Sequence, residues 1–200
     1  MRGITTLFII ISFYTFGNAQ YKPSARFLEY YHQGLSVGFG LNLVDNSGGL
    51  NFLKGYLNYE SMALKNPFSL SVEYRQSRKF SFLGRMSVNQ WISNKGIIDR
   101  KIIPSDLNYL GFDGGLKFYF DELLERPSSR NWFELFVEGG LGYFQIDKGQ
   151  LSINFGGGAI FWISKTMALN LQLMTKSTKN ELSLFSSSHY QTFIGFKIMI

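Results

Sequence analysis

Residues 188–200 read S-H-Y-Q-T-F-I-G-F-K-I-M-I, and this stretch decides the fold. Its even positions, from Tyr190 to Ile200, are mostly apolar, whereas its odd positions are mixed and include Lys197. A period of two residues predicts a β-strand with one apolar face. Such a strand needs a partner along its edge. In a closed barrel, the partner of the last strand is the first strand.

Seven earlier segments show the same alternation and are separated by polar or turn-forming stretches. The eight predicted strands cover residues 34–44, 68–75, 80–91, 107–120, 132–145, 150–163, 167–175 and 188–200. Residues 45–67, 92–106 and 176–187 are predicted to be long loops. In the first loop, residues 50–59 suit either a short extra strand or a segment folded over the barrel mouth. The predicted fold class is all-β, an eight-stranded antiparallel up-and-down β-barrel.

Periodicity alone does not say whether the apolar face points inward, as in a soluble lipocalin-like barrel, or outward to lipid. The strands at 107–120, 132–145 and 150–163 have 14 residues each. That is longer than the ~5–6 residues usual in soluble sheets, and sufficient to cross a bilayer with tilt. Aromatic residues also gather at the strand ends, as in the two girdles of a membrane barrel. One rim is predicted to hold Tyr74, Phe80, Phe82, Phe118, Phe120, Phe133, Phe161 and Phe196, and the other Phe68, Tyr143 and Tyr190. These features favour a transmembrane barrel.

The N-terminus carries an export signal in residues 1–19: Arg2, an apolar run of 13 residues from Ile4 to Phe16, and a small-residue cleavage site. The alternative, an anchor helix, needs about 20 apolar residues. Residues 20–33 are predicted to be a periplasmic lead-in, and residues 34–200 the barrel domain. Without residues 1–19 the chain has 19 basic and 14 acidic side chains, a net charge of +5. It contains no cysteine, which excludes disulfides and thiol chemistry.

Several strand patterns resemble a known family. They are V-G-F-G-L-N-L-V-D (37–45), S-D-L-N-Y-L-G-F-D-G-G-L-K-F-Y-F (105–120), F-E-L-F-V-E-G-G-L-G-Y-F (133–144), I-N-F-G-G-G-A-I-F-W-I-S (153–164) and H-Y-Q-T-F-I-G-F-K-I-M-I (189–200). Together they resemble the barrel of outer-membrane protein A-like porin-family proteins. The resemblance implies an outer-membrane barrel. Many members of that family continue into a peptidoglycan-binding domain, and the pattern here ends at Ile200, so a wall-tethering role is not implied.

Charged side chains on the inward face form the main candidate site. Four acids and four bases are predicted to lie in the lumen with zero net charge: Glu73, Asp113, Glu134, Glu138, Arg75, Arg85, Lys117 and Lys197. A regular register across the 121–131 link would put Lys117 near Glu134 and Asp113 near Glu138. An eight-stranded barrel has an interior just wide enough for side chains to fill, and buried charges persist there when paired. The set therefore predicts either a structural plug of ion pairs or a narrow, gated ion path.

No catalytic, cofactor-binding or metal site is predicted. His189 lies at the outer rim of the last strand, where some lipid A-deacylating barrels carry His and, two residues later, Ser; here that residue is Gln191. Two distant histidines and no cysteine provide no metal-ligand spacing. Basic residues expected in exposed loops could bind glycolipid phosphates: Lys54, Lys65, Lys95, Arg100, Lys101, Lys148, Lys176 and Lys179.

The sequence favours a monomeric, non-enzymatic outer-membrane barrel with a structural or surface-interaction role in the cell envelope. A narrow pore for small solutes or ions is the alternative, and a lipid A-modifying enzyme the third. Expected partners are outer-membrane lipid and lipopolysaccharide, together with the barrel assembly machinery, which would engage the C-terminal strand. Nucleic acid is not an expected partner of an exported protein.

Overall fold

The computed structural model describes residues 34–45, 62–93, 97–98, 101–102, 105–120, 132–178 and 188–200. The predicted signal peptide, the lead-in and the 50–59 segment lie outside the described residues. The strands are β1 (Gly34–Asp45), β2 (Met62–Ala63), β3 (Lys65–Arg75), β4 (Phe80–Trp91), β5 (Ile97–Ile98), β6 (Lys101–Ile102), β7 (Leu107–Tyr119), β8 (Phe133–Gln145), β9 (Gly149–Trp162), β10 (Met167–Ser177) and β11 (His189–Met199).

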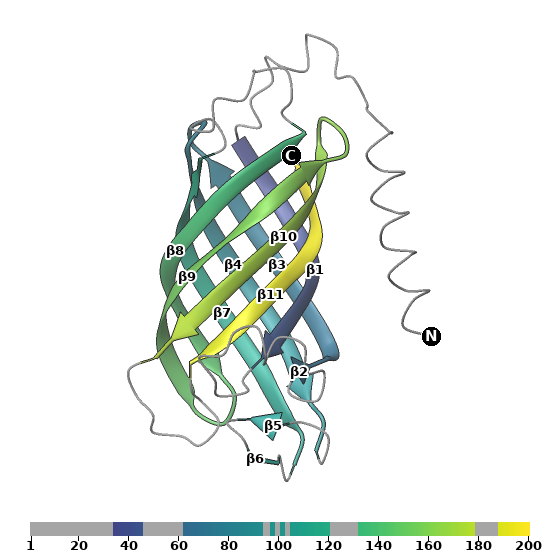
Figure 1. Ribbon diagram of the computed structural model, residues 1–200, viewed down its shortest axis with the longest axis vertical. Helices are drawn as coiled ribbons and strands as arrows, with labels where there is room; N and C mark the ends of the chain where they lie inside the picture. Colours follow the sequence, from purple (N-terminus) through teal and green to yellow (C-terminus); the bar gives the residue numbers. More distant parts are fainter. Residues whose placement is uncertain are drawn as a thin grey trace, which may run out of the picture.

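Eight long strands form a closed antiparallel barrel in which each strand pairs with its neighbours in the chain (Figure 1). The barrel closes where β11 pairs with β1, with Val37 opposite Ile198 and Phe39 opposite Phe196. The prediction that the first strand is the partner of the last is therefore confirmed, as is the all-β eight-stranded fold. The very short β2 extends the sheet beside β1, and β5 and β6 form a separate small hairpin.

The two ends of the barrel are named by what lies there. At the terminal end, uppermost in Figure 1, β1 begins and β11 ends. At the loop end, β4 leads through the β5–β6 hairpin to β7. The strands run alternately between these two ends, so each position along a strand has a defined height in the barrel.

Two strands extend by two or more residues beyond their predicted bounds. β3 begins at Lys65, because a bulge between Lys65 and Phe68 absorbs Asn66, whose φ is 58°, and Pro67 within the strand. β10 continues to Ser177, with Lys176 opposite Asn154 on one side and His189 on the other. Polar composition at both strand ends had suggested loops.

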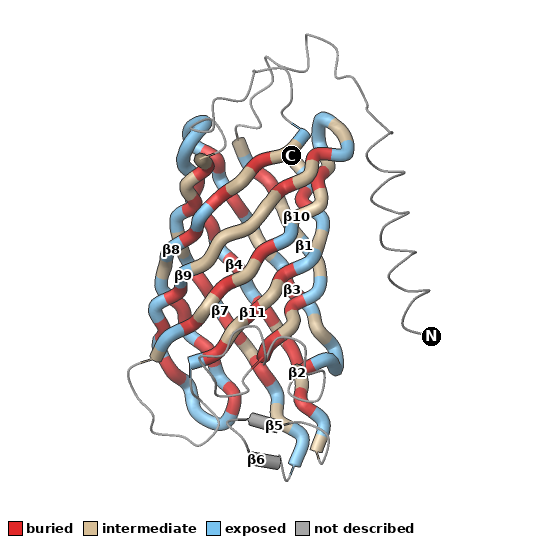
Figure 2. Tube along the Cα trace, in the orientation of Figure 1, coloured by how far each residue is buried: buried red, intermediate tan, exposed pale blue. Residues whose placement is uncertain are grey.

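Side chains alternate between the interior and the outer wall along every long strand, as the buried and exposed bands of Figure 2 show. The outward positions carry large apolar side chains, including Leu141, Leu151 and Ile153, which are 69%, 77% and 67% exposed. The inward positions carry the charged and amide side chains. Among the described residues, no helix is long and apolar enough to cross a membrane.

Aromatic side chains fill both ends of the interior. At the loop end, Trp91, Tyr109 and Phe144 pack with Val44 and Ala63. At the terminal end a second cluster consists of Tyr119, Phe136, Ile160, Trp162 and Ala168. The charged side chains therefore share the interior with rings and aliphatic groups toward both ends of the barrel.

Candidate functional site

All eight charged residues predicted to face the lumen are buried in the interior, and Lys176 joins them. These nine residues are four acids and five bases, so Lys176 changes the formal net charge of the set from the predicted zero to +1. Lys176 is fully buried, so its predicted place in an exposed loop is wrong. The reason is that β10 continues past Thr175, and Lys176 has the same inward parity as Gln172.

Near the terminal end, Glu73 binds two lysines at once. Its Oε2 lies 3.0 Å from Lys117 Nζ and its Oε1 lies 2.9 Å from Lys197 Nζ. The Tyr119 hydroxyl also donates a short hydrogen bond to Oε1. Two ammonium groups and one hydroxyl donor therefore stabilise a carboxylate that is only 3% exposed.

Arg75 is held beside this cluster by several groups. Its Nη1 donates to Glu134 Oε1 at 2.7 Å, and its Nη2 donates to the Arg78 carbonyl at 2.7 Å. The guanidinium carbon lies 3.8 Å from the centroid of the Tyr119 ring. The planar cation thus combines an ion pair, a turn contact and a cation–π contact.

Halfway along the barrel, Arg85 and Glu138 form a two-pronged ion pair. Both guanidinium Nη atoms lie 3.2 Å from a carboxylate oxygen of Glu138. Gln172 closes the group, because its Oε1 accepts from Arg85 at 2.8 Å and its Nε2 donates to Glu138 at 2.8 Å. The Arg85 guanidinium also lies over the Phe193 ring, 4.1 Å from its centroid.

Toward the loop end, Asp113 pairs with Lys176, whose Nζ lies 2.6 Å from Asp113 Oδ1. Asn154 Nδ2 donates to the same oxygen at 2.8 Å. Lys176 also donates to the Tyr109 hydroxyl oxygen at 3.1 Å, and Gln191 donates to that oxygen at 2.7 Å. Tyr109 is thus the centre of a polar group that the sequence reasoning missed, although it shares inward parity with Asp113.

The predicted ion pairs between β7 and β8 are wrong. Lys117 lies opposite Glu138 rather than near Glu134, and Asp113 lies opposite Gly142. The 121–131 link sets this four-residue difference. Among the described residues, every ion pair of the interior joins strands that are not neighbours: β3 with β7, β8 or β11, β4 with β8, and β7 with β10. The pairs therefore cross the bore of the barrel.

His189, predicted at the outer rim of the last strand, is the first residue of β11 and is buried inside the barrel. Its ring meets those of Tyr109 and Phe144 edge-on, with centroids 5.5 Å and 4.7 Å apart. Its Nε2 lies 3.3 Å from the Tyr109 hydroxyl oxygen. The first residue of β11 faces inward because it has the parity of Gln191 and Phe193.

The predicted girdle residues occupy the outer wall at the two ends. Ten of the eleven occupy outward strand positions, and Phe120 directly follows β7. At the terminal end, Phe80 contacts Phe118 and Phe133 contacts Phe161, each with ring centroids 5.1 Å apart. Trp132, which was not among the predicted girdle residues, packs on this second pair and is half exposed. No cluster of histidine and carboxylate side chains that could hold a metal ion occurs in the described part of the chain.

Three solved structures share this architecture. Neisserial surface protein A is 10% identical, with a TM-score of 0.54, over 83% of this chain and 96% of that one. OprG from Pseudomonas aeruginosa is 10% identical, with a TM-score of 0.53, over 84% and 98%. The outer-membrane protein AlkL is 15% identical, with a TM-score of 0.52, over 86% and 92%.

The chain has the small outer-membrane barrel fold. The predicted resemblance is confirmed at the level of fold, because identities of this size show no more than the fold. No protein-family model matches the sequence, and no curated protein is similar enough in sequence to match.

Proposed function

We propose that this chain is an integral outer-membrane protein that serves as a structural or surface-interaction component of the cell envelope. The observation that carries the proposal is the inverted distribution of polarity. Ionised groups fill the interior, whereas aliphatic and aromatic side chains cover the outer wall. A soluble protein rarely exposes a continuous apolar surface of this extent, and a lipid-facing barrel wall requires one.

The contents of the bore favour a plug over a pore. Ion pairs that cross the bore occupy three levels, and aromatic side chains pack among them toward both ends. An ion would have to separate these pairs in order to pass, and breaking a buried pair costs about 3–5 kcal/mol. We therefore propose that the barrel does not conduct at rest.

The proposal includes no catalytic role for His189. Its imidazole is enclosed by Tyr109 and Phe144, away from the outer surface where a lipid ester would lie. The residue two positions later, Gln191, donates to Tyr109 rather than offering a nucleophile. Lipid A from cells that express the wild type or His189→Ala should carry the same acyl chains. Acyl loss that depends on His189 would identify an enzyme instead.

Gel mobility and conductance test the proposal directly. Isolated outer membranes should contain the protein, and the unboiled form should migrate differently from the boiled form. Recovery of the protein in the soluble periplasmic fraction would refute membrane insertion. Planar bilayers that contain the purified barrel should show no sustained openings, whereas steady nanosiemens-scale openings would establish the pore alternative.

The remaining parts of the proposal concern partners. We propose a monomer that contacts membrane lipid and lipopolysaccharide and is inserted by the barrel assembly machinery through β11. The outward face of β11 is mostly apolar, and the strand pairs along its length with both β1 and β10. It is therefore the strand that completes the wall.

A further inference from the structure

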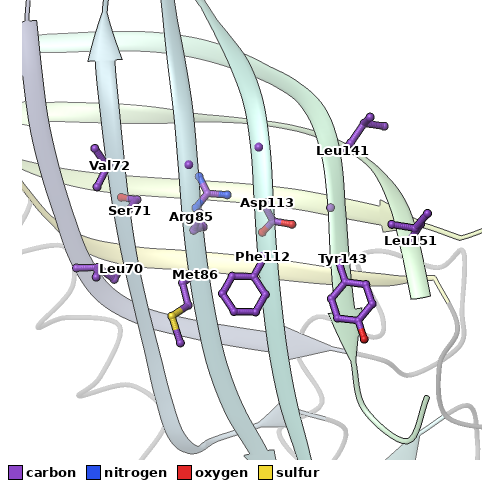
Figure 3. A pocket seen from close by; sticks show the side chains of 13 residues that line it. Leu70, Ser71, Val72, Arg85, Met86, Phe112, Asp113, Leu141, Tyr143 and Leu151 are labelled. Carbon is purple, nitrogen blue, oxygen red and sulfur yellow. The ribbon is translucent and has the colours of Figure 1, made fainter. Parts of the chain in front are cut away.

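The outer wall has a depression, with a volume of about 550 Å³, where β3, β4, β7, β8 and β9 run side by side (Figure 3). Its floor is formed by Gly84 and Gly114, which lie directly opposite each other on β4 and β7. A Cβ atom built on either glycine would meet no atom within 4 Å. The two missing side chains therefore leave open space on the outside of the wall.

The depression presents an apolar surface. Its outward-pointing walls are made by Leu70, Val72, Met86, Phe112, Leu141 and Leu151. Arg85 and Asp113 contribute to its lining, but their charged groups turn into the interior and bind Glu138 and Lys176. An occupant would meet methyl groups, a thioether and a ring, and would meet no ionised group.

One polar group stands at the border of the depression. Tyr143 lies two residues before the end of β8. Its ring extends toward the β8–β9 turn, because its hydroxyl oxygen lies 2.0 Å from the position that a Cβ atom on Gly149 would take. The hydroxyl is therefore directed toward the loop end (Figure 3). Gly84 and Gly114 lie near the middle of their strands. The site thus has an apolar middle and a hydrogen-bonding group at one end.

We infer that this depression binds one acyl chain of a membrane phospholipid, with the ester end of the chain beside Tyr143. The inference rests on the proposed membrane location and adds to it a site of defined position. The depression lies within the apolar outer wall, and its volume is within the range of about 300–1,000 Å³ typical of small-molecule sites.

A phospholipid chain fits the depression better than a second copy of the barrel does. The wall of another barrel is convex and would bridge a concave surface, leaving the glycine floor without contacts. A flexible methylene chain can follow the floor and fill it. Because no ionised side chain points into the depression, binding should depend on the chain and little on the headgroup.

The test counts bound lipid by native mass spectrometry. The full chain is refolded in detergent micelles that contain dimyristoyl phosphatidylglycerol or dimyristoyl phosphatidylcholine, and folding is checked by the mobility shift on heating. The wild type should retain one lipid of either kind after the others are stripped. Gly84→Leu or Gly114→Leu, each of which fills the floor, should lower the occupancy about tenfold, equivalent to about 1.4 kcal/mol.

Gly139→Leu is the matched control. Gly139 also points outward into open space, but it does not line the depression. This variant should retain the lipid. Unchanged occupancy in both floor variants, or equal loss in the control, would overturn the site. A wild-type dimer that the floor variants abolish would assign the depression to a second copy of the chain.

Failure of this inference differs from failure of the proposed function. A barrel that enters vesicles and becomes heat-modifiable but retains no lipid contradicts the site alone. A wild-type chain that stays outside vesicles contradicts the membrane location itself. If one floor variant does not fold, the other still tests the site, because the two glycines belong to different strands.

Discussion

Replacing Glu73 with glutamine tests whether the interior is a dry plug of ion pairs. The substitution preserves the shape of the side chain but removes the charge that faces Lys117 at 3.0 Å and Lys197 at 2.9 Å. Glu134, the next carboxylate of this end, already binds Arg75 at 2.7 Å. Two buried ammonium groups would therefore lose their acidic partner.

The expected cost follows from the burial of these groups. Removing one member of a buried ion pair costs about 3–5 kcal/mol, because the remaining charge has neither water nor a partner. Since Glu73 serves two lysines, we expect a loss near the upper end of this range. Urea unfolding of the refolded barrel in vesicles, followed by tryptophan fluorescence and gel mobility, measures the free energy of unfolding.

A compensated variant separates unpaired charge from altered packing. Glu73→Met combined with Lys117→Met and Lys197→Met removes all three charges while keeping side chains of similar length. Replacing a buried ionic cluster with apolar groups is often neutral or stabilising, so this variant should regain most of the lost stability. If Glu73→Gln alone unfolds within about 0.5 kcal/mol of the wild type, then both lysines are hydrated and the plug is refuted.

Three further predictions concern the wall, one loop contact and the closing strand. Gly140→Ala should destabilise the barrel by about 1–3 kcal/mol, because the new Cβ would lie 2.2 Å from the Gly114 carbonyl oxygen. Gly139→Ala, whose Cβ would meet no atom within 4 Å, should have the free energy of unfolding of the wild type in the same urea titration. The pKa of Asp106 is held below its ordinary value of 3.8 by the Ser93 amide and by Lys65. This contact therefore contributes stability at pH values above the ordinary pKa, and that contribution is lost as the pH falls through the lowered pKa of Asp106. The NMR signal of the Ser93 amide should shift only in that acidic range. A shift between pH 5 and 8 would contradict the assignment. Deleting residues 196–200 should abolish membrane insertion, because the deletion removes the pairing partners of one end of both β1 and β10. Ile200→Phe should insert normally, because the Ile200 side chain is 79% exposed. Fractionation and gel mobility distinguish the two outcomes.

The strands and their faces could be predicted from sequence because alternation is a local property. In residues 107–120 the apolar and polar faces were assigned correctly, since a strand places successive side chains on opposite sides wherever it lies in the barrel. The strand ends were harder to predict. Asn66 and Pro67 resemble a turn, yet the bulge lets the chain pass through them and continue the ladder.

The register between β7 and β8 depended on the 121–131 link, whose contribution to the alignment cannot be read from its composition. The error was four residues, an even number, so Glu134 and Glu138 kept their inward faces while their neighbours changed. A register shift by one residue is prevented by the different polarity of the two faces, because it would turn the charged side chains to the outer wall. A register shift by two or four residues keeps every side chain on its face, so the local pattern does not exclude it.

The pairing of the lumen charges was beyond sequence reasoning for a deeper reason. Rules for charge pairs in sheets concern residues opposite each other on adjacent strands, but Arg75 binds Glu134 and Asp113 binds Lys176 across the bore. Which residues meet across a bore depends on the strand number and the stagger of the closed barrel. Those quantities exist only once β1 and β11 have joined. This dependence on closure also supports the proposed plug. Ion pairs between strands that are not neighbours lie inside the bore, where they occupy the space that an ion would need.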